Sequence, residues 1–312
     1  MSLRAIVAAL GGELYAGGRR ANVPAPGHSP ADRSVSLLLA DGRVVAHSFG
    51  AASWRDVLDD LRARGLIDAT GAPTGAALPG AVRLGGSDLT GLERVAAAQA
   101  LWCAGAALRD RAPAGRYCRW RGIEGDLIEL TALRSHPSAP VAIYRPAGRT
   151  MPALLAAVTD AFGEITAVEV TYLDPNGRRT RALRLSRKTV GRLPAGSAVR
   201  LASMSPELLV AEGVFTALSA MAAFQLPGWA LLSTSNLRRW GPPDGVRRVL
   251  IAADRGRGGE AAAAELRERL VARGVAAVIR LPPRPHGDWN EAAQAEGRRK
   301  GADGRPARRE GP

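Results

Sequence analysis

Three acidic residues in the C-terminal third of the chain each follow a short apolar run. Glu212 comes after "ELLVA", Asp254 after "VLIAA", and Asp288 a few residues after "AAVIRL". If these runs are neighbouring strands of a parallel sheet, their carboxyl ends lie at one rim, where open α/β sheets bind ligands. Convergent carboxylates without His or Cys favour Mg²⁺ or Mn²⁺. The alternative is that each acid only stabilises the N-terminus of the helix after it.

The elements that must position these acids alternate between strand and helix. The apolar pattern predicts strands at 207–211, 229–232, 247–253 and 276–281, with helices at 214–224 and 257–272. This alternation is typical of a small parallel sheet flanked by helices, so the predicted fold class is α/β. The region before it, from about 127 to 201, contains β-prone runs such as "ITAVEVTYLD" and "RALRLS". Its turn sequences "DAFGE" and "DPNGRR" indicate an antiparallel or mixed α+β unit.

The N-terminal region is predicted to be a separate β-ribbon and helix unit. Asp41-Gly42 between two strand-like runs indicates a hairpin, and Ser53 is a good N-cap for the helix that follows. The expected organisation of the chain is a first unit at 1–67, a Gly-, Ala- and Pro-rich linker at 68–92, a basic α+β domain at 93–201, the α/β domain at 202–296, and a disordered basic tail at 297–312.

The composition limits the possible partners. The 312 residues carry a formal net charge of +14, which favours an anionic partner such as nucleic acid. Only two of the 43 basic residues are lysines, a bias that a GC-rich genome produces by itself. Two cysteines provide no disulfide framework, which favours a reducing cytoplasm, and no apolar run is long enough to predict a membrane span. The absence of GxxxxGK[ST], GxSxG and HExxH argues against a P-loop motor, a hydrolase elbow and a zinc protease.

Arginines alternate with aromatic residues in "RYCRWRGI". Arg116, Arg119, Trp120 and Arg121 are candidates for binding single-stranded nucleic acid, because bases stack on rings while guanidinium groups follow phosphates. The alternative is a helix that packs its aromatic residues in the core and leaves its arginines in solvent. In the N-terminal unit Arg33 and Arg43 are candidates for phosphate contacts, and equally for solvated loop residues.

Three blocks of the C-terminal region resemble the Toprim catalytic domain that bacterial primases, topoisomerases and related nucleases share. The blocks are "AEGVFTALSA", "VLIAADRGRGGEAAAAELRERL" and "PPRPHGDWNE", and their order and spacing are closest to primase-like Toprim proteins of phages, plasmids and integrated elements. The resemblance implies a Rossmann-like fold. It matches Glu212 to the Toprim glutamate, which is often given the role of general base, and Asp254 to the first acid of the DxD motif.

The second acid of that motif is missing. Gly256 stands in its place, and Gly259 matches the motif glycine. This departure puts two-metal catalysis in doubt, because a principal ligand is lost. Glu260 and Asp288 are the residues that could supply a replacement.

The segment "PAPGHSPADRSVSLLLADGRVVAHSFGAAS" resembles the zinc-ribbon domain with which bacterial primases bind template. His28 matches the histidine of that motif, but Ala25 replaces the first cysteine, and this segment contains no cysteine. Because structural zinc nearly always has four ligands, we expect a ribbon without zinc.

By resemblance, the chain is expected to be a primase-type enzyme that uses Mg²⁺ or Mn²⁺ to transfer nucleotides on a single-stranded DNA template. It would act in the replication of DNA or of a mobile element, with nucleotides, single-stranded DNA and a separate helicase as partners. Two alternatives remain open. One is a degenerate Toprim protein that only binds single-stranded DNA or a helicase, and the other is a Toprim nuclease.

Overall fold

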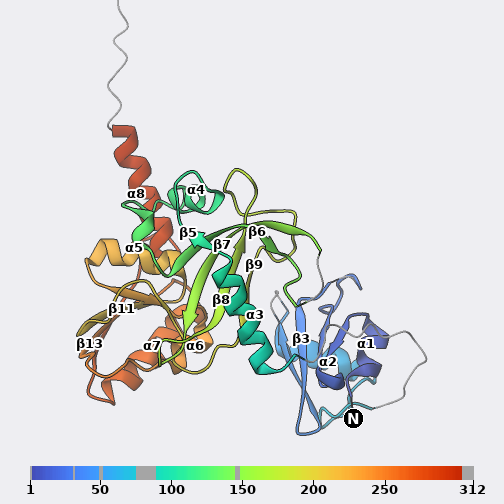
Figure 1. The fold of residues 1–312 in the computed structure, drawn as a ribbon. Coiled ribbons are helices and arrows are strands. Elements are labelled where there is room, and N and C mark those ends of the chain that lie inside the picture. The colour runs from blue at the N-terminus through green and yellow to red at the C-terminus, as the bar shows by residue number, and fades with distance from the viewer. Residues whose placement is uncertain (1, 31, 49–51, 75–88, 145–147, 304–312) are drawn as a thin grey trace, which may run out of the picture. The chain divides into compact units, whose positions relative to one another are not determined.

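The computed structural model describes residues 2–30, 32–48, 52–74, 89–144 and 148–303. The chain divides into two compact units, Met1–Thr90 and Gly91–Pro312, and each has its own sheets and core (Figure 1). In the described residues, no helix is both long and apolar enough to cross a membrane.

The first unit is a four-stranded antiparallel sheet with helices packed against it. Its elements are α1 (Arg4–Leu10), β1 (Glu13–Tyr15), a 3₁₀ turn (Ala16–Gly18), β2 (Arg20–Val23), β3 (Val35–Ala40), β4 (Arg43–Ser48) and α2 (Trp54–Ala63), and the strand order is β1-β2-β3-β4. Alternate residues of β3, namely Val35, Leu37 and Leu39, are buried, as expected for a sheet with one face on the core.

The local signals of this unit are confirmed. Asp41 and Gly42, with φ of 47° and 76°, form the two-residue turn between β3 and β4. Ser53 caps α2, because its hydroxyl accepts the Asp56 N–H while the Asp56 carboxylate accepts the Ser53 N–H.

Part of the predicted linker belongs to this unit. The Asp68 carboxylate accepts the N–H groups of Thr70 and Ala72, and the Val44 N–H donates to the Gly71 carbonyl. Residues 68–74 are therefore folded against β4, and a linker is wrong for them. Residues 75–88 lie outside the described part of the chain.

The second unit begins with a five-stranded antiparallel sheet in the order β5-β6-β7-β8-β9. Its elements are α3 (Gly91–Cys103), β5 (Ala106–Ala107), α4 (Pro113–Trp120), a 3₁₀ turn (Leu127–Glu129), β6 (Leu133–Pro140), β7 (Thr150–Thr159), β8 (Ile165–Tyr172) and β9 (Arg187–Gly191). Helix α3 packs Leu101 against Val168 on one face, and α4 packs Cys118 against Leu154 on the other.

The predicted strand "RALRLS" is wrong. The N–H of Thr180 donates to the carbonyl of Tyr172, and the N–H of Tyr172 donates to the carbonyl of Ser186. Because both bonds are made to one residue, the segment between them loops out, and Leu185 is exposed. Strand β9 begins only at Arg187.

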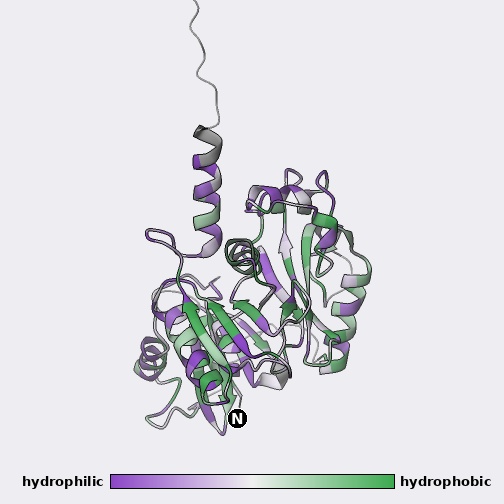
Figure 2. Ribbon diagram, turned by 90° about the vertical axis from the view of Figure 1, so that its left-hand side faces the viewer, coloured by the Kyte–Doolittle hydropathy of each residue, from purple (hydrophilic) through white to green (hydrophobic). Residues whose placement is uncertain are grey.

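A second five-stranded sheet has the order β10-β12-β11-β13-β14 and is parallel except for β10. Its elements are β10 (Val199–Arg200), β11 (Glu207–Ala211), α5 (Val214–Phe224), β12 (Gly228–Ala230), α6 (Thr234–Arg239), β13 (Arg248–Ala252), α7 (Arg257–Val271), β14 (Ala276–Arg280) and α8 (Trp289–Asp303). One face packs against α5, and the other packs Val210 and Ile251 against Leu266 of α7. Figure 2 shows that several of the strands are strongly hydrophobic.

The α/β fold class is confirmed, and every strand and helix predicted between 207 and 281 is present within a few residues. The disordered tail is wrong for 297–303, because α8 continues to Asp303. Asp288 Oδ1 accepts the Glu291 N–H at the start of this helix, and the Glu291 carboxylate accepts the Gly287 N–H. The Glu, Arg and Ala residues after it favour helix. Residues 304–312 lie outside the described chain.

Candidate active site

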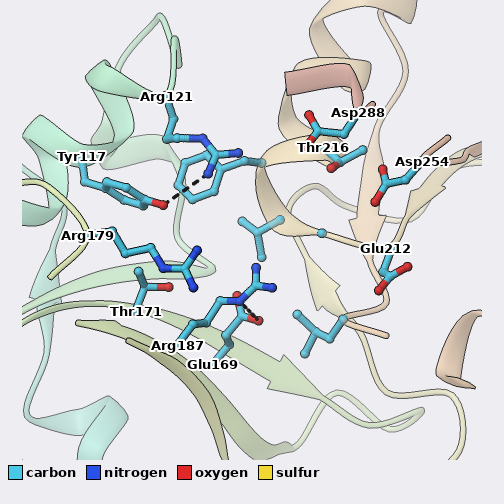
Figure 3. A pocket seen from close by; sticks show the side chains of 14 residues that line it. Tyr117, Arg121, Glu169, Thr171, Arg179, Arg187, Glu212, Thr216, Asp254 and Asp288 are labelled. Atoms are coloured by element: carbon cyan, nitrogen blue, oxygen red, sulfur yellow. Dashed lines mark hydrogen bonds and ion pairs between the residues drawn. The ribbon is translucent and has the colours of Figure 1, made fainter. Parts of the chain in front are cut away.

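The second unit contains a pocket of about 240 Å³ where its two sheets meet. One side consists of residues after β11, after β13 and at the start of α8, and the other of residues from α4, β8 and β9 (Figure 3). The lining residues are Tyr117, Arg121, Glu169, Thr171, Arg179, Arg187, Glu212, Gly213, Val214, Phe215, Thr216, Leu232, Asp254 and Asp288.

Three of the predicted acids lie on the first side. Glu212 directly follows β11, and Asp254 follows β13 by two residues. These strands are parallel neighbours with Ala211 beside Ala252, so their carboxyl ends coincide. Asp288 joins them from the α8 N-terminus, where one of its oxygens accepts the Glu291 N–H. Because these acids follow strands of the same parallel sheet, Glu212, Asp254 and Asp288 line one pocket.

Asp254 is electrostatically unusual. Its Oδ1 is buried and has no hydrogen-bond partner. The pKa of Asp254 is raised to about 6, mainly by burial and also by the Asp288 and Glu212 carboxylates, whereas the hydrogen bond from the Thr216 hydroxyl lowers it. Burial also raises the pKa of Glu212, against the opposing charge of Arg187. The buried Oδ1 of Asp254 therefore lacks a hydrogen-bond donor that would stabilise its negative charge.

The acids fit a magnesium ion held in part by the substrate. In the described ranges no three His, Cys, Asp or Glu side chains are grouped closely enough to hold one ion. Mg²⁺ commonly takes one or two carboxylates and completes its shell with water and substrate phosphates. The buried, unpartnered Oδ1 of Asp254, with Glu212 or Asp288 nearby, is a donor set of that kind.

Glu260 does not contribute to the pocket. It lies in the first turn of α7, and its exposed carboxylate accepts the Gly256 N–H at 3.1 Å. A carboxylate is stabilised there by the helix dipole and the free N–H groups. Glu260 therefore caps its own helix, and the prediction that it replaces the missing acid is not supported by its position.

The glycines of this segment have distinct backbone roles. Gly256 has φ of +119°, a conformation in which an aspartate would be strained, so its backbone does not suit the acid that the motif would place there. A Cβ at Gly259 would lie 2.8 Å from the Asp254 carbonyl oxygen, so α7 can approach the strand end only with glycine at this position.

Three arginines face the acids across the pocket (Figure 3). Each is held through its Nε: Arg121 by Asn290 Oδ1, Arg179 by Ser186 Oγ at 2.7 Å, and Arg187 by Glu169 Oε2 at 3.8 Å. Anchoring at Nε leaves the terminal nitrogens of Arg179 and Arg187 available, and Arg121 keeps Nη2 while its Nη1 donates to the Tyr117 hydroxyl. Terminal guanidinium nitrogens bind phosphate oxygens.

Glu169 is the one carboxylate on the arginine side. Its side chain is 13% exposed, and burial raises its pKa while Arg187 and Arg179 lower it. Glu169 and Arg187 were not among the site residues predicted from the sequence. Their only signal was a β-prone, arginine-rich region, and their place in the pocket depends on how two sheets meet.

Of the arginines predicted in "RYCRWRGI", only Arg121 lines the pocket. Arg119 pairs with Asp110 at 2.6 Å and donates to the Ile123 carbonyl, and Arg116 donates to the carbonyls of Arg111 and Pro175. Arg116 and Arg119 therefore hold local structure.

Trp120 is 47% exposed, stacks on Tyr117, and lies under the Arg178 guanidinium at 4.5 Å. Tyr117 is buried, as the packing alternative predicted. Trp120 keeps an exposed surface, so base stacking on it stays a prediction.

The candidates of the first unit lie in a loop and at the start of strand β4. Arg33 donates to the Pro30 and Asp32 carbonyls, both at 2.6 Å, whereas Arg43 is exposed beside the β3–β4 turn. Ala25 is buried, and its N–H donates to Asp32 Oδ2 at 3.0 Å. His28 lies 3.4 Å from the same carboxylate.

Comparison with known families identifies the C-terminal part. Residues 207–299 match the model of the Toprim domain. The chain contains a Toprim domain. The resemblance found in the sequence is thereby confirmed, and Glu212, Asp254 and Asp288 all lie within this domain. Residues 92–201 match a domain of unknown function, DUF7146. No curated protein matches the chain.

Solved structures similar to this Toprim protein include three primases. The primase fragment of the bacteriophage T7 primase-helicase protein is 17% identical, with 90% of this chain and 97% of that chain covered and a TM-score of 0.40. The zinc-binding and RNA polymerase domains of Aquifex aeolicus primase are 15% identical, with 90% and 78% covered and a TM-score of 0.46. A DNA primase domain from Pseudomonas aeruginosa is 14% identical, with 68% and 78% covered and a TM-score of 0.45.

Proposed function

We propose that this Toprim protein transfers nucleotides in the manner of a primase, with Mg²⁺ or Mn²⁺, on a single-stranded DNA template during replication of DNA or of a mobile element. The observation that carries the proposal is the opposition of three carboxylates and three arginines across one pocket, with an unpartnered oxygen on Asp254. Such a pocket suits a ligand that carries both phosphate oxygens and a divalent cation.

The chemistry divides between the two sides of the pocket. A bound metal ion, held by Asp254 with Glu212 or Asp288, would polarise the α-phosphate and neutralise the leaving pyrophosphate. The Arg121, Arg179 and Arg187 guanidinium groups would bind the phosphate oxygens and hold the nucleotide in line with the primer end.

The transfer step needs one base. The primer 3′-oxygen attacks the α-phosphorus, the bond to pyrophosphate breaks, and the proton of the 3′-hydroxyl passes to a carboxylate. Glu212 is the proposed base, because burial raises its pKa toward the range in which a carboxylate accepts protons effectively.

A second candidate function is binding without chemistry. Gly256 in place of an acid, with a backbone that an aspartate would strain, favours it. In that case the arginine side would hold single-stranded DNA, and a separate helicase would be the functional partner. A third candidate, DNA cleavage, would use the same acids.

Template-directed synthesis distinguishes these functions. The purified chain is incubated with single-stranded DNA, labelled nucleotides and Mg²⁺ or Mn²⁺, and compared with Glu212→Gln and Asp254→Asn. Labelled product from the wild type alone, with equal DNA binding by all three proteins, supports nucleotidyl transfer. DNA binding without synthesis or cleavage supports the second candidate, and cleavage that both substitutions abolish supports the third.

A further inference from the structure

Asn290, in the first turn of α8, has no exposed surface and uses its whole hydrogen-bonding capacity. Its Nδ2 donates to the Arg121 carbonyl at 2.7 Å and to Ser219 Oγ at 2.9 Å. Its Oδ1 accepts from Arg121 Nε and from Gln294 Nε2. One carboxamide thus holds both the main chain and the side chain of Arg121.

These bonds join three elements around the pocket. Arg121 follows α4, Ser219 lies on α5, and Asn290 belongs to α8. The Arg121 guanidinium lies 4.6 Å from the Phe215 ring centroid, and its Nη1 is 3.3 Å from the Tyr117 hydroxyl. With Nε bound to Asn290, the guanidinium is fixed in plane and direction as it enters the pocket (Figure 3).

The same segment also carries an acid of the opposite side. Asp288 caps α8 two residues before Asn290 and lines the pocket opposite Arg121. Displacement of Asn290 would therefore change both the direction of Arg121 and the position of Asp288.

We propose that Asn290 is a positioning residue that sets the geometry of the phosphate site by orienting Arg121 against the acidic side. This inference rests on the proposed function, since it assumes that the pocket takes a nucleoside triphosphate. Asn290 touches no ligand itself and acts through Arg121.

A double-mutant cycle separates this role from a purely structural one. The affinity for ATP is measured by calorimetry, with and without Mg²⁺, for Asn290→Ala, Arg121→Ala and the double variant. Asn290→Ala is expected to weaken binding about tenfold, as Arg121→Ala does, because one charge-assisted contact is lost in each. In the Arg121→Ala background the Asn290 substitution should add less than about twofold.

A matched control accounts for lost stability. Leu266 is fully buried on α7 in the core on the other face of the sheet, and it does not line the pocket. Leu266→Ala should lower the melting temperature and leave ATP affinity unchanged. If Asn290→Ala weakens binding by the same factor with and without Arg121, or leaves it unchanged, the positioning role is refuted.

The orientation of Arg121 has its own readout. In ¹⁵N spectra the Arg121 Nε–H should exchange slowly with solvent in the wild type and in Leu266→Ala, and rapidly in Asn290→Ala. If Asn290→Ala does not fold, Asn290→Asp serves instead: it keeps the acceptor for Nε–H, and it should retain slow exchange yet lose ATP affinity because its carboxylate neutralises the guanidinium.

Failure of the proposed function is distinguishable from failure of this inference. A wild-type protein that binds no ATP contradicts the proposed phosphate site, and the Nε–H exchange rate then decides by itself whether Asn290 orients Arg121. Equal exchange rates in the wild type and Asn290→Ala would refute the orientation in either case.

Discussion

Two segments lack a metal ligand that the families they resemble carry, and their surroundings differ. In the first unit, Ala25 stands in place of a cysteine. It is buried, and the Asp32 carboxylate accepts its N–H together with the Arg33 N–H and the Ser34 hydroxyl. A carboxylate therefore organises this loop with hydrogen bonds of its own.

In the second unit, Gly256 stands in place of an acid, yet one oxygen of the neighbouring Asp254 has no partner within the chain. Its Oδ1 is buried without a partner beside two further carboxylates. A buried, unpaired carboxylate oxygen costs stability, and the proposed cation would satisfy it. The contrast is between a carboxylate whose oxygens accept hydrogen bonds from its own loop and a carboxylate that keeps one unpartnered oxygen in a pocket.

The largest effect is expected from Asp254→Asn. The substitution keeps the shape of the side chain and removes its charge, so nucleotide incorporation should fall by roughly a hundredfold or more, because metal stabilisation of the transition state is lost. Primer synthesis under saturating Mg²⁺ measures the change. Unchanged incorporation would show that Asp254 is not required for nucleotide transfer.

Arg187→Ala should weaken nucleotide binding by about tenfold, because one guanidinium contact to phosphate is lost. Glu169→Gln should have a smaller effect, since it loosens Arg187 without removing its charge. Calorimetric titration of ATP compares both. An equal loss in the two variants would mean that Glu169 contributes more than an anchor.

Without divalent cations the second unit should be less stable at pH 7 than at pH 5. The pKa of Asp254 is raised to about 6 from 3.8, so the folded state holds the proton more tightly, and stability declines as pH rises across that interval. The raised pKa values of Glu212 and Glu169 act in the same direction. Allowing for partial exposure, Asp254 should account for roughly 1–2 kcal/mol.

Thermal unfolding in EDTA at the two pH values tests this dependence. Asp254→Asn should flatten it, and Mg²⁺ should stabilise the wild type more than the variant at pH 7. An equal pH dependence in the two proteins would assign the effect to other groups.

In the first unit, Asp32→Ala should lower stability by about 1–2 kcal/mol, because several hydrogen bonds of the loop lose their acceptor. Zinc and EDTA should leave the melting temperature of this unit unchanged. His28→Ala is the control, since His28 is largely exposed and should matter little. Stabilisation by zinc would show that the loop still binds metal.

The smallest effect is expected from Glu260→Ala. Loss of the bond to the Gly256 N–H should cost about 0.5–1 kcal/mol of stability and leave nucleotide incorporation unchanged. Chemical denaturation and primer synthesis test the two parts. Lost incorporation at unchanged stability would restore Glu260 as a replacement ligand.

The acidic side of the pocket could be predicted from the sequence because it follows from a topological rule. Glu212 and Asp254 come after runs that form adjacent parallel strands, and parallel strands end at one edge. No such rule predicts the positions of the arginines on the other side of the pocket. Arg179 lies in a turn and Arg187 begins a strand that was placed too early, and both reach the pocket only through contact between two sheets.

Asn290 shows the same limit. It belongs to the quoted block "PPRPHGDWNE", yet the sequence predicted no helix after Asp288, and its partner Arg121 is 169 positions away along the chain. Gly256 shows the converse: the missing acid was visible in the sequence, whereas the positive φ that accompanies it was not.

Binding of Mn²⁺, followed by electron paramagnetic resonance, tests most directly whether the pocket is organised for a cation. The wild type should bind Mn²⁺ in the presence of ATP, and Asp254→Asn should weaken that binding at least about tenfold, while Asp32→Ala should not change it. Equal Mn²⁺ affinity in the wild type and Asp254→Asn would contradict the assignment of the unpartnered Asp254 oxygen to a metal.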